Sequence, residues 1–191
     1  MIAEGAIRWD DRGPQPLASG EDLGLRTADL NTWVRQVRGG IMAGAFAVER
    51  MLSAAIIHYF LDWRIRDIEV QEAFDEGILQ TLSFERRIAL ATLIADKFFE
   101  VDDCKALKSG LSSLRTLRNA MAHNPFWFEP QFNDDNTLQG LVPVIRRGKG
   151  IVGLTTKFVE EQNRVIQGLI ARSEALVVAV VAQMNERSPA P

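Results

Sequence analysis

Apolar residues recur at three- and four-residue spacing along most of the chain, and this period restricts it to a helical fold. The clearest case is the set Leu107, Leu111, Leu114, Leu117 and Met121, which falls on one face of an α-helix. Pro125 ends this helix, because proline disfavours the α conformation of the residue before it. We therefore predict a helix from about Asp102 up to Pro125.

The same period predicts the other helices. One long helix runs from Ile41 to about Trp63, and another runs from Thr155 or Thr156 to about Arg187. Ser83 is the expected N-cap of a helix from Phe84 to Phe99, in which Leu93 faces the core and Arg87 faces out.

Two shorter segments carry weaker helical signals. An acidic helix or helix-loop is expected over residues 67–81. A short helix from Thr27 or Asp29 to about Arg38 is expected to end at Gly39-Gly40, because glycine is frequent where helices end.

The pattern changes after Pro125. Short extended pieces are expected at 126–132, 141–146 and 151–154, with turns at Asn133–Asn136 and Gly148–Gly150 between them. The prediction is an all-α fold, a bundle of about five helices with a small β-hairpin insert after the motif helix, over residues 126–154.

Length and composition indicate one soluble globular domain. The chain has 191 residues, enough for one core, with 47% hydrophobic and 25% charged residues. We expect an irregular or extended N-terminal arm over residues 1–26, a single domain over 27–187 and a tail over 188–191.

Several features favour the cytoplasm and argue against a membrane. Cys104 is the only cysteine, so no intrachain disulfide can form, and it is a poor candidate nucleophile. The N-terminus lacks the basic and apolar regions of a signal peptide. Glu49 interrupts the Ile41–Trp63 helix, and the apolar run Glu174–Met184 covers only about three turns. We expect that run to pack against the Ile41–Trp63 helix and to reach a subunit interface.

The net charge of −3 gives the chain no general attraction for nucleic acid, so any RNA binding must be local. Arg146, Arg147 and Lys149 form the densest basic patch in the sequence, and Trp127 nearby could stack on bases. The alternative is a solvated hairpin tip with core aromatic residues beneath it.

Two charged residues fall among apolar ones. Arg118 lies in the apolar stripe of the motif helix, and Glu49 lies in the wide apolar sector of the Ile41–Trp63 helix. A buried charge needs a partner of opposite sign, so we expect these two residues to pair. The remaining polar residue of interest is His123, about 140° around the helix from Arg118 and one turn after Asn119.

Arg118-Asn119-Ala120-Met121-Ala122-His123 resembles the R-polar-x3-H motif of the HEPN superfamily. These all-α domains include many metal-independent RNases of toxin–antitoxin, phage-defence and CRISPR systems. The resemblance extends over roughly residues 40 to 185 in layout. In that family the arginine and histidine of two protomers meet at a two-fold interface, which implies a homodimer here. The layout is also similar to that of the mannitol operon repressor family.

The resemblance implies a metal-independent endoribonuclease, without cofactor or metal, that cleaves RNA through attack by the 2′-hydroxyl. His123 would act as base or acid, Arg118 would hold the phosphate and Asn119 would orient His123. Glu49 would support Arg118. A cognate antitoxin is a further partner that the resemblance implies. The alternative is a non-catalytic dimeric module that regulates or binds nucleotides, like the mannitol operon repressor relatives.

Overall fold

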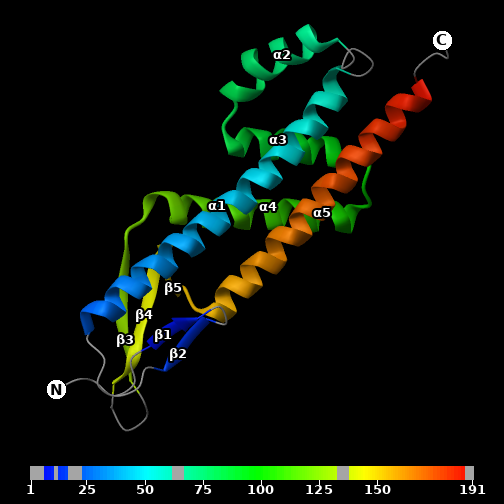
Figure 1. The fold of residues 1–191 in the computed structure, drawn as a ribbon. Coiled ribbons are helices and arrows are strands. Elements are labelled where there is room, and N and C mark those ends of the chain that lie inside the picture. Colours follow the sequence, from blue (N-terminus) through cyan, green and yellow to red (C-terminus); the bar gives the residue numbers. More distant parts are fainter. Residues whose placement is uncertain (1–6, 11–12, 17–22, 62–66, 133–137, 188–191) are drawn as a thin grey trace. The chain divides into compact units, whose positions relative to one another are not determined.

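The computed structural model describes residues 7–10, 13–16, 23–61, 67–132 and 138–187, and this part of the chain forms five α-helices and two small antiparallel sheets (Figure 1). The helices are α1 (Leu23–Leu61), α2 (Ile68–Gly77), α3 (Phe84–Ala95), α4 (Val101–His123) and α5 (Thr156–Arg187). The strands are β1 (Ile7–Asp10), β2 (Gly13–Pro16), β3 (Phe126–Phe132), β4 (Leu138–Arg147) and β5 (Gly150–Gly153). The predicted helical bundle with a small β insert is confirmed.

Helix α1 differs from its prediction. It begins at Leu23 and continues through Gly39-Gly40, where the sequence predicted an end. Neither glycine has the positive φ of a helix C-cap. Buried Val34, Val37 and Ile41 keep the helical period across the glycine pair, and their burial outweighs the low helix propensity of glycine.

Local side-chain caps begin three of the described helices, and at the start of α5 Thr155 Oγ1 accepts from the N–H of Phe158 at 3.2 Å. The Asp67 carboxylate accepts hydrogen bonds from the backbone N–H groups of Glu69 and Val70, at 3.1 and 3.3 Å. Ser83 Oγ accepts from the N–H of Arg86 at 3.3 Å, which confirms the predicted cap of α3. This helix ends at Ala95 instead of Phe99. Leu93, predicted to face the core, is 63% exposed.

The chain divides into two compact units, residues 1–43 with 116–164 and residues 44–115 with 165–191. The single domain over 27–187 stays a prediction.

The second unit packs the later part of α1 against α3, the first part of α4 and the later part of α5. Its core contains Val48, Leu52, Ile88, Leu107 and Leu176. A Cβ atom on Gly44 would lie 2.7 Å from Ile166 Cγ2, and one on Gly110 would lie 2.7 Å from Leu169 Cδ2. These glycines therefore let α5 approach α1 and α4 closely. The predicted packing of the last helix on the Ile41–Trp63 segment is confirmed.

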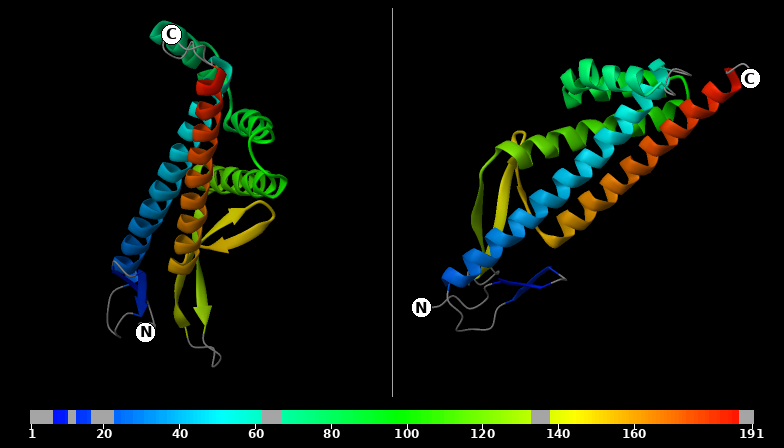
Figure 2. Two further views of the ribbon diagram at one scale, coloured as in Figure 1. Left: turned by 90° about the vertical axis from the view of Figure 1, so that its right-hand side faces the viewer. Right: turned by 45° about the horizontal axis from the view of Figure 1, so that its top comes forward.

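The first unit contains the three-stranded sheet, in the order β3-β4-β5, which follows the end of α4 (Figure 2). Phe126 pairs with Ile145, and Val144 pairs with Gly153. Gly148 turns the chain between β4 and β5 with a φ of 61°, a conformation that favours glycine. The core of this unit joins side chains of α1, α4 and the sheet, namely Val34, Val37, Ile41, Leu117, Ala120, Met121, Ile145 and Leu154.

The predicted N-terminal arm contains the antiparallel β1–β2 pair, in which Ile7 lies opposite Pro16. These eight residues are extended, whereas residues 23–26, which were also assigned to the arm, belong to α1. The expected turn at 133–136 and the expected tail at 188–191 lie outside the described residues.

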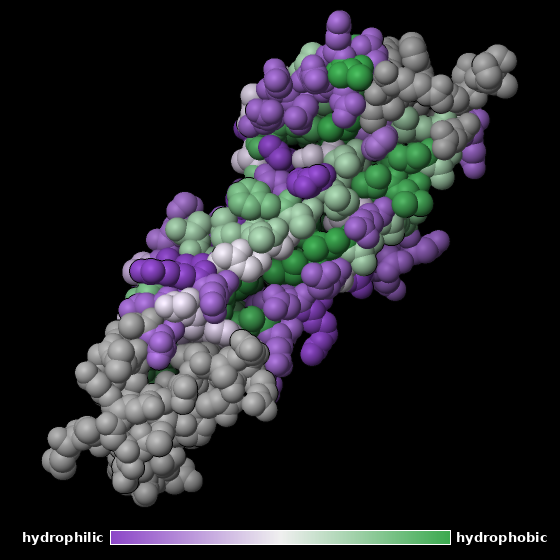
Figure 3. Space-filling view, in the orientation of Figure 1, coloured by the Kyte–Doolittle hydropathy of each residue, from purple (hydrophilic) through white to green (hydrophobic). Residues whose placement is uncertain are grey.

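Helices α1 and α5 are apolar over long stretches. Asp29–Leu61 and Thr156–Met184 are long and apolar enough to cross a membrane by length and composition, a test that core helices of soluble proteins also pass. The apolar part of the last helix is thus longer than the three turns expected. Hydrophobic side chains gather over the C-terminal half of α5 in Figure 3, where Val178 is 67% exposed.

Candidate active site

The last two turns of α4 carry Arg118, Asn119 and His123. Leu117 and Met121 on the same turns are buried in the core of the first unit. Arg118 beside this stripe is half-buried, whereas Asn119 and His123 are exposed. His123 is the last helical residue, and the dipole of the helix favours a cation at that end. A base or acid at this position is open to a ligand from solvent.

Asn124, directly after His123, fixes the end of the helix. Its backbone N–H donates to the Ala120 carbonyl at 3.0 Å, and its side-chain Nδ2 donates to the Arg146 carbonyl at 2.6 Å. Its own carbonyl accepts a hydrogen bond from Arg38 Nη2 of α1. The residue that follows His123 is thus held by both α1 and β4.

The contact between Asn124 and Arg146 places the basic strand at the end of the motif helix. Arg146 and Lys149 are exposed and Arg147 is half-buried. In the register of the sheet, Arg146 lies opposite Ile151 and Arg147 lies opposite Gly150. The predicted position of the hairpin beside the motif is confirmed. Of the expected basic residues, Arg146 and Arg147 lie on β4, and Lys149 lies in the turn between β4 and β5.

Trp127 is half-buried on β3, and its Nε1 donates to Glu129 Oε1 at 3.0 Å. The neighbouring Phe126 and Phe128 rings meet edge to face, with centroids 5.8 Å apart. The carboxylate beside Trp127 opposes a nearby phosphate. Stacking of a base on Trp127 therefore stays a prediction. The alternative, in which these rings are core aromatic residues, also stays open.

Glu49 has a cationic partner on α3. Arg87 Nη1 lies 3.1 Å from Glu49 Oε1, and the two side chains are 16% and 13% exposed. Arg87 also donates to Ser53 Oγ at 3.2 Å and to the Leu79 carbonyl at 2.8 Å. The expectation that Arg87 faces out was wrong, because its long side chain reaches back to the carboxylate. Glu49 and Arg118 belong to different units, so their pairing stays a prediction.

The sequence reasoning missed Arg38 and Asn124. Asn124 had a local signal, its place between His123 and Pro125. Arg38 had none, because the residue that it contacts lies 86 positions later in the chain.

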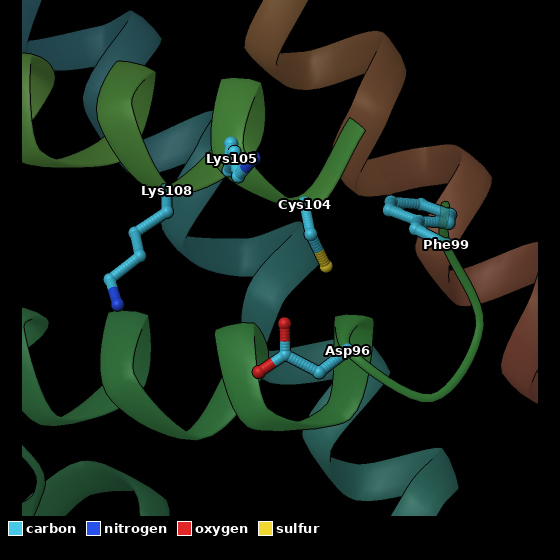
Figure 4. Close-up of a pocket in the computed structure, with 5 residues that line it drawn as sticks. All are labelled: Asp96, Phe99, Cys104, Lys105 and Lys108. Carbon is cyan, nitrogen blue, oxygen red and sulfur yellow. The ribbon is translucent and has the colours of Figure 1, made fainter. Parts of the chain in front are cut away.

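A pocket of about 250 Å³ lies in the second unit between the end of α3 and the start of α4 (Figure 4). The Asp96 carboxylate points toward Cys104 in this pocket, with Lys105 and Lys108 on the same side as Cys104. Burial, with an added contribution from Asp96, raises the pKa of the Cys104 thiol to about 11. The thiol is therefore protonated at neutral pH, which supports the expectation that it is no nucleophile.

No group of three or more His, Cys, Asp or Glu residues that could hold a metal ion occurs among the described residues. Comparison of the chain with family models, with curated proteins and with solved structures finds no match.

Proposed function

We propose that the protein is a HEPN-like, metal-independent endoribonuclease that acts as a homodimer. The observation that supports this most is the hydrogen bond from Asn124 Nδ2 to the Arg146 carbonyl, at 2.6 Å. It joins the helix end that carries His123 to the strand that carries the basic residues. An acidic protein needs such a local concentration of cations to bind a phosphate backbone.

The chemistry requires three groups. A base takes the proton of the 2′-hydroxyl, a cation stabilises the charge on the phosphorane oxygens, and an acid protonates the leaving 5′-oxygen. His123 serves as base or acid. Arg118 holds the phosphate, which a guanidinium does with two parallel hydrogen bonds. Asn119 orients His123, and Glu49 supports Arg118.

A dimer completes this site. Arg118 and His123 diverge by about 140° on one helix, so both reach a single phosphate only if a second protomer contributes one of them. A two-fold interface supplies the second His123 as the other proton-transfer group.

We place this enzyme in the cytoplasm, as a toxin or phage-defence effector that a cognate antitoxin restrains.

The second candidate is a non-catalytic dimeric module that regulates or binds nucleotides, as in the mannitol operon repressor family. The net charge of −3 favours it, because this charge gives no long-range attraction for RNA. In this case Arg118 and His123 make contacts across the dimer interface and take no part in catalysis.

The test is product chemistry in the presence of EDTA. Wild-type protein is incubated with an RNA, with the DNA of the same sequence, and with an RNA that carries a single 2′-deoxy nucleotide at the main cleavage position. The proposal predicts RNA fragments that end in a 2′,3′-cyclic phosphate or 3′-phosphate, no DNA cleavage, and loss of cleavage at the deoxy position. Fragments with 3′-hydroxyl ends, or activity abolished by EDTA, would contradict it.

A further inference from the structure

We infer that Arg38 is a positioning residue, which holds the end of α4 so that His123 is presented at a fixed place; the catalytic consequence rests on the proposed ribonuclease function. Arg38 lies on α1, far from the motif in sequence. Its guanidinium nevertheless donates through Nη2 to the carbonyl of Asn124, the residue after His123.

The carbonyl that Arg38 binds is one that the helix cannot satisfy itself. The last carbonyls of an α-helix have no intrahelical donor, and the chain leaves the helical path at Pro125, so no further helical turn follows to supply one. A cation at this end also interacts favourably with the helix dipole. Arg38 therefore supplies both a donor and a charge where α4 lacks them.

A second contact fixes the guanidinium itself. Arg38 Cζ lies 5.2 Å from the centroid of the Phe126 ring, the first residue of β3, within the range of a cation–π interaction. The side chain thus links α1, the end of α4 and the start of β3. With the Asn124–Arg146 hydrogen bond, Asn124 is held from two directions.

The position of the Arg38 side chain also carries a cost in free energy. Its Nε is buried and has no hydrogen-bond acceptor among the described residues, and such a donor costs free energy. An uncharged side chain would avoid that cost. A planar cation placed here despite the cost suits a helix end that must not move.

Loss of the Arg38–Asn124 hydrogen bond should lower kcat more than it changes KM. A small displacement of a catalytic group costs up to about 100-fold in rate, whereas the RNA phosphates would still meet Arg118 and Arg146. For Arg38→Ala we expect kcat to fall about 10- to 100-fold with KM changed less than about twofold. Arg38→Lys keeps a donor for the Asn124 carbonyl and should recover part of kcat. Arg35→Ala is the matched control, because Arg35 is exposed on the same helix.

The experiment combines these kinetics with proton NMR of the histidines. The chain has two histidines, so the Cε1–H signal of His123 is assigned by its absence in His123→Ala. We expect Arg38→Ala to shift or broaden the His123 signal and to leave that of His58 in place. Arg38→Lys should give a smaller change, and Arg35→Ala should give none.

Two results would overturn the inference: an unchanged kcat in Arg38→Ala, whether or not KM is raised, or an unaltered His123 signal. If Arg38→Ala does not fold, Arg38→Lys decides by the same readouts. If the wild type cleaves no RNA, the proposed function fails. The NMR comparison then decides the positioning role alone, where a moved His123 signal supports it and an unmoved one refutes it.

Discussion

At the scale of single residues, the charged side chains within apolar sectors are the informative ones. The sequence predicted that Glu49 requires a cation, and Arg87 is one such cation in the structure, 3.1 Å away. The identity of this partner could not be predicted. Helical periodicity gives the face on which a side chain starts, but not how far a flexible arginine bends back from that face.

Removal of one member of the Glu49–Arg87 pair should destabilise the protein strongly. Both side chains are mostly buried, and truncation of one partner of a buried ion pair costs about 3–5 kcal/mol. We expect Glu49→Gln and Arg87→Ala to approach this loss in urea denaturation, and Arg86→Ala, at an exposed position, to change little. Unchanged stability in Glu49→Gln would show that the pair is not buried in solution.

Cys104 should react with thiol reagents only slowly in the folded protein. Burial raises the pKa of its thiol to about 11, so the reactive thiolate is scarce at about pH 8, near the pKa of a free cysteine. We expect rapid labelling by a disulfide reagent in urea and slow labelling without it, with a rate that increases as the pH rises. Equal rates in both conditions would contradict the burial of this thiol.

At the scale of elements, the sequence predicted features that depend on neighbouring residues. Ser83 begins α3 and Pro125 follows α4 as expected, because caps and prolines act within one turn. The prediction failed at Gly39-Gly40, where the flanking apolar residues are buried and keep α1 helical. The low helix propensity of two glycines costs less free energy than burial of the flanking apolar residues supplies.

The glycine pair gives a direct test of the continuous helix. A Cβ atom on Gly39 or Gly40 would meet nothing within 4 Å, so alanine at either position should raise the free energy of unfolding by about 0.5–1 kcal/mol. Gly110→Ala should lower it, because its Cβ would lie 2.7 Å from Leu169 Cδ2. Destabilisation by alanine at position 39 or 40 would contradict a helical conformation there.

At the scale of the whole molecule, contacts between residues far apart in the chain could not be predicted from the sequence. The motif residues Arg118, Asn119 and His123 were singled out through the resemblance of their sequence to a known motif, and the basic hairpin was predicted beside them because Pro125 ends the helix. The hydrogen bond from Arg38 to Asn124 was not predicted from the sequence, because periodicity does not say which helix faces which strand.

Assembly is the prediction at this scale. We expect a two-fold dimer that buries part of the motif helix and its neighbours, with the apolar end of α5 around Val178 as a further part of the interface. Light scattering at micromolar concentration should give twice the mass of the chain. A monomer under these conditions would remove the composite site and most of the case for catalysis.

The most direct measurement of the central claim is the rate of RNA cleavage in EDTA by wild-type protein, His123→Ala and His58→Gln. Loss of a proton-transfer group costs about 100-fold or more in rate, and an exposed residue at a helix end contributes little to stability. The account predicts metal-free cleavage by the wild type and by His58→Gln, and none by a folded His123→Ala. Equal cleavage by His123→Ala, or no cleavage of any RNA by the wild type, would contradict it.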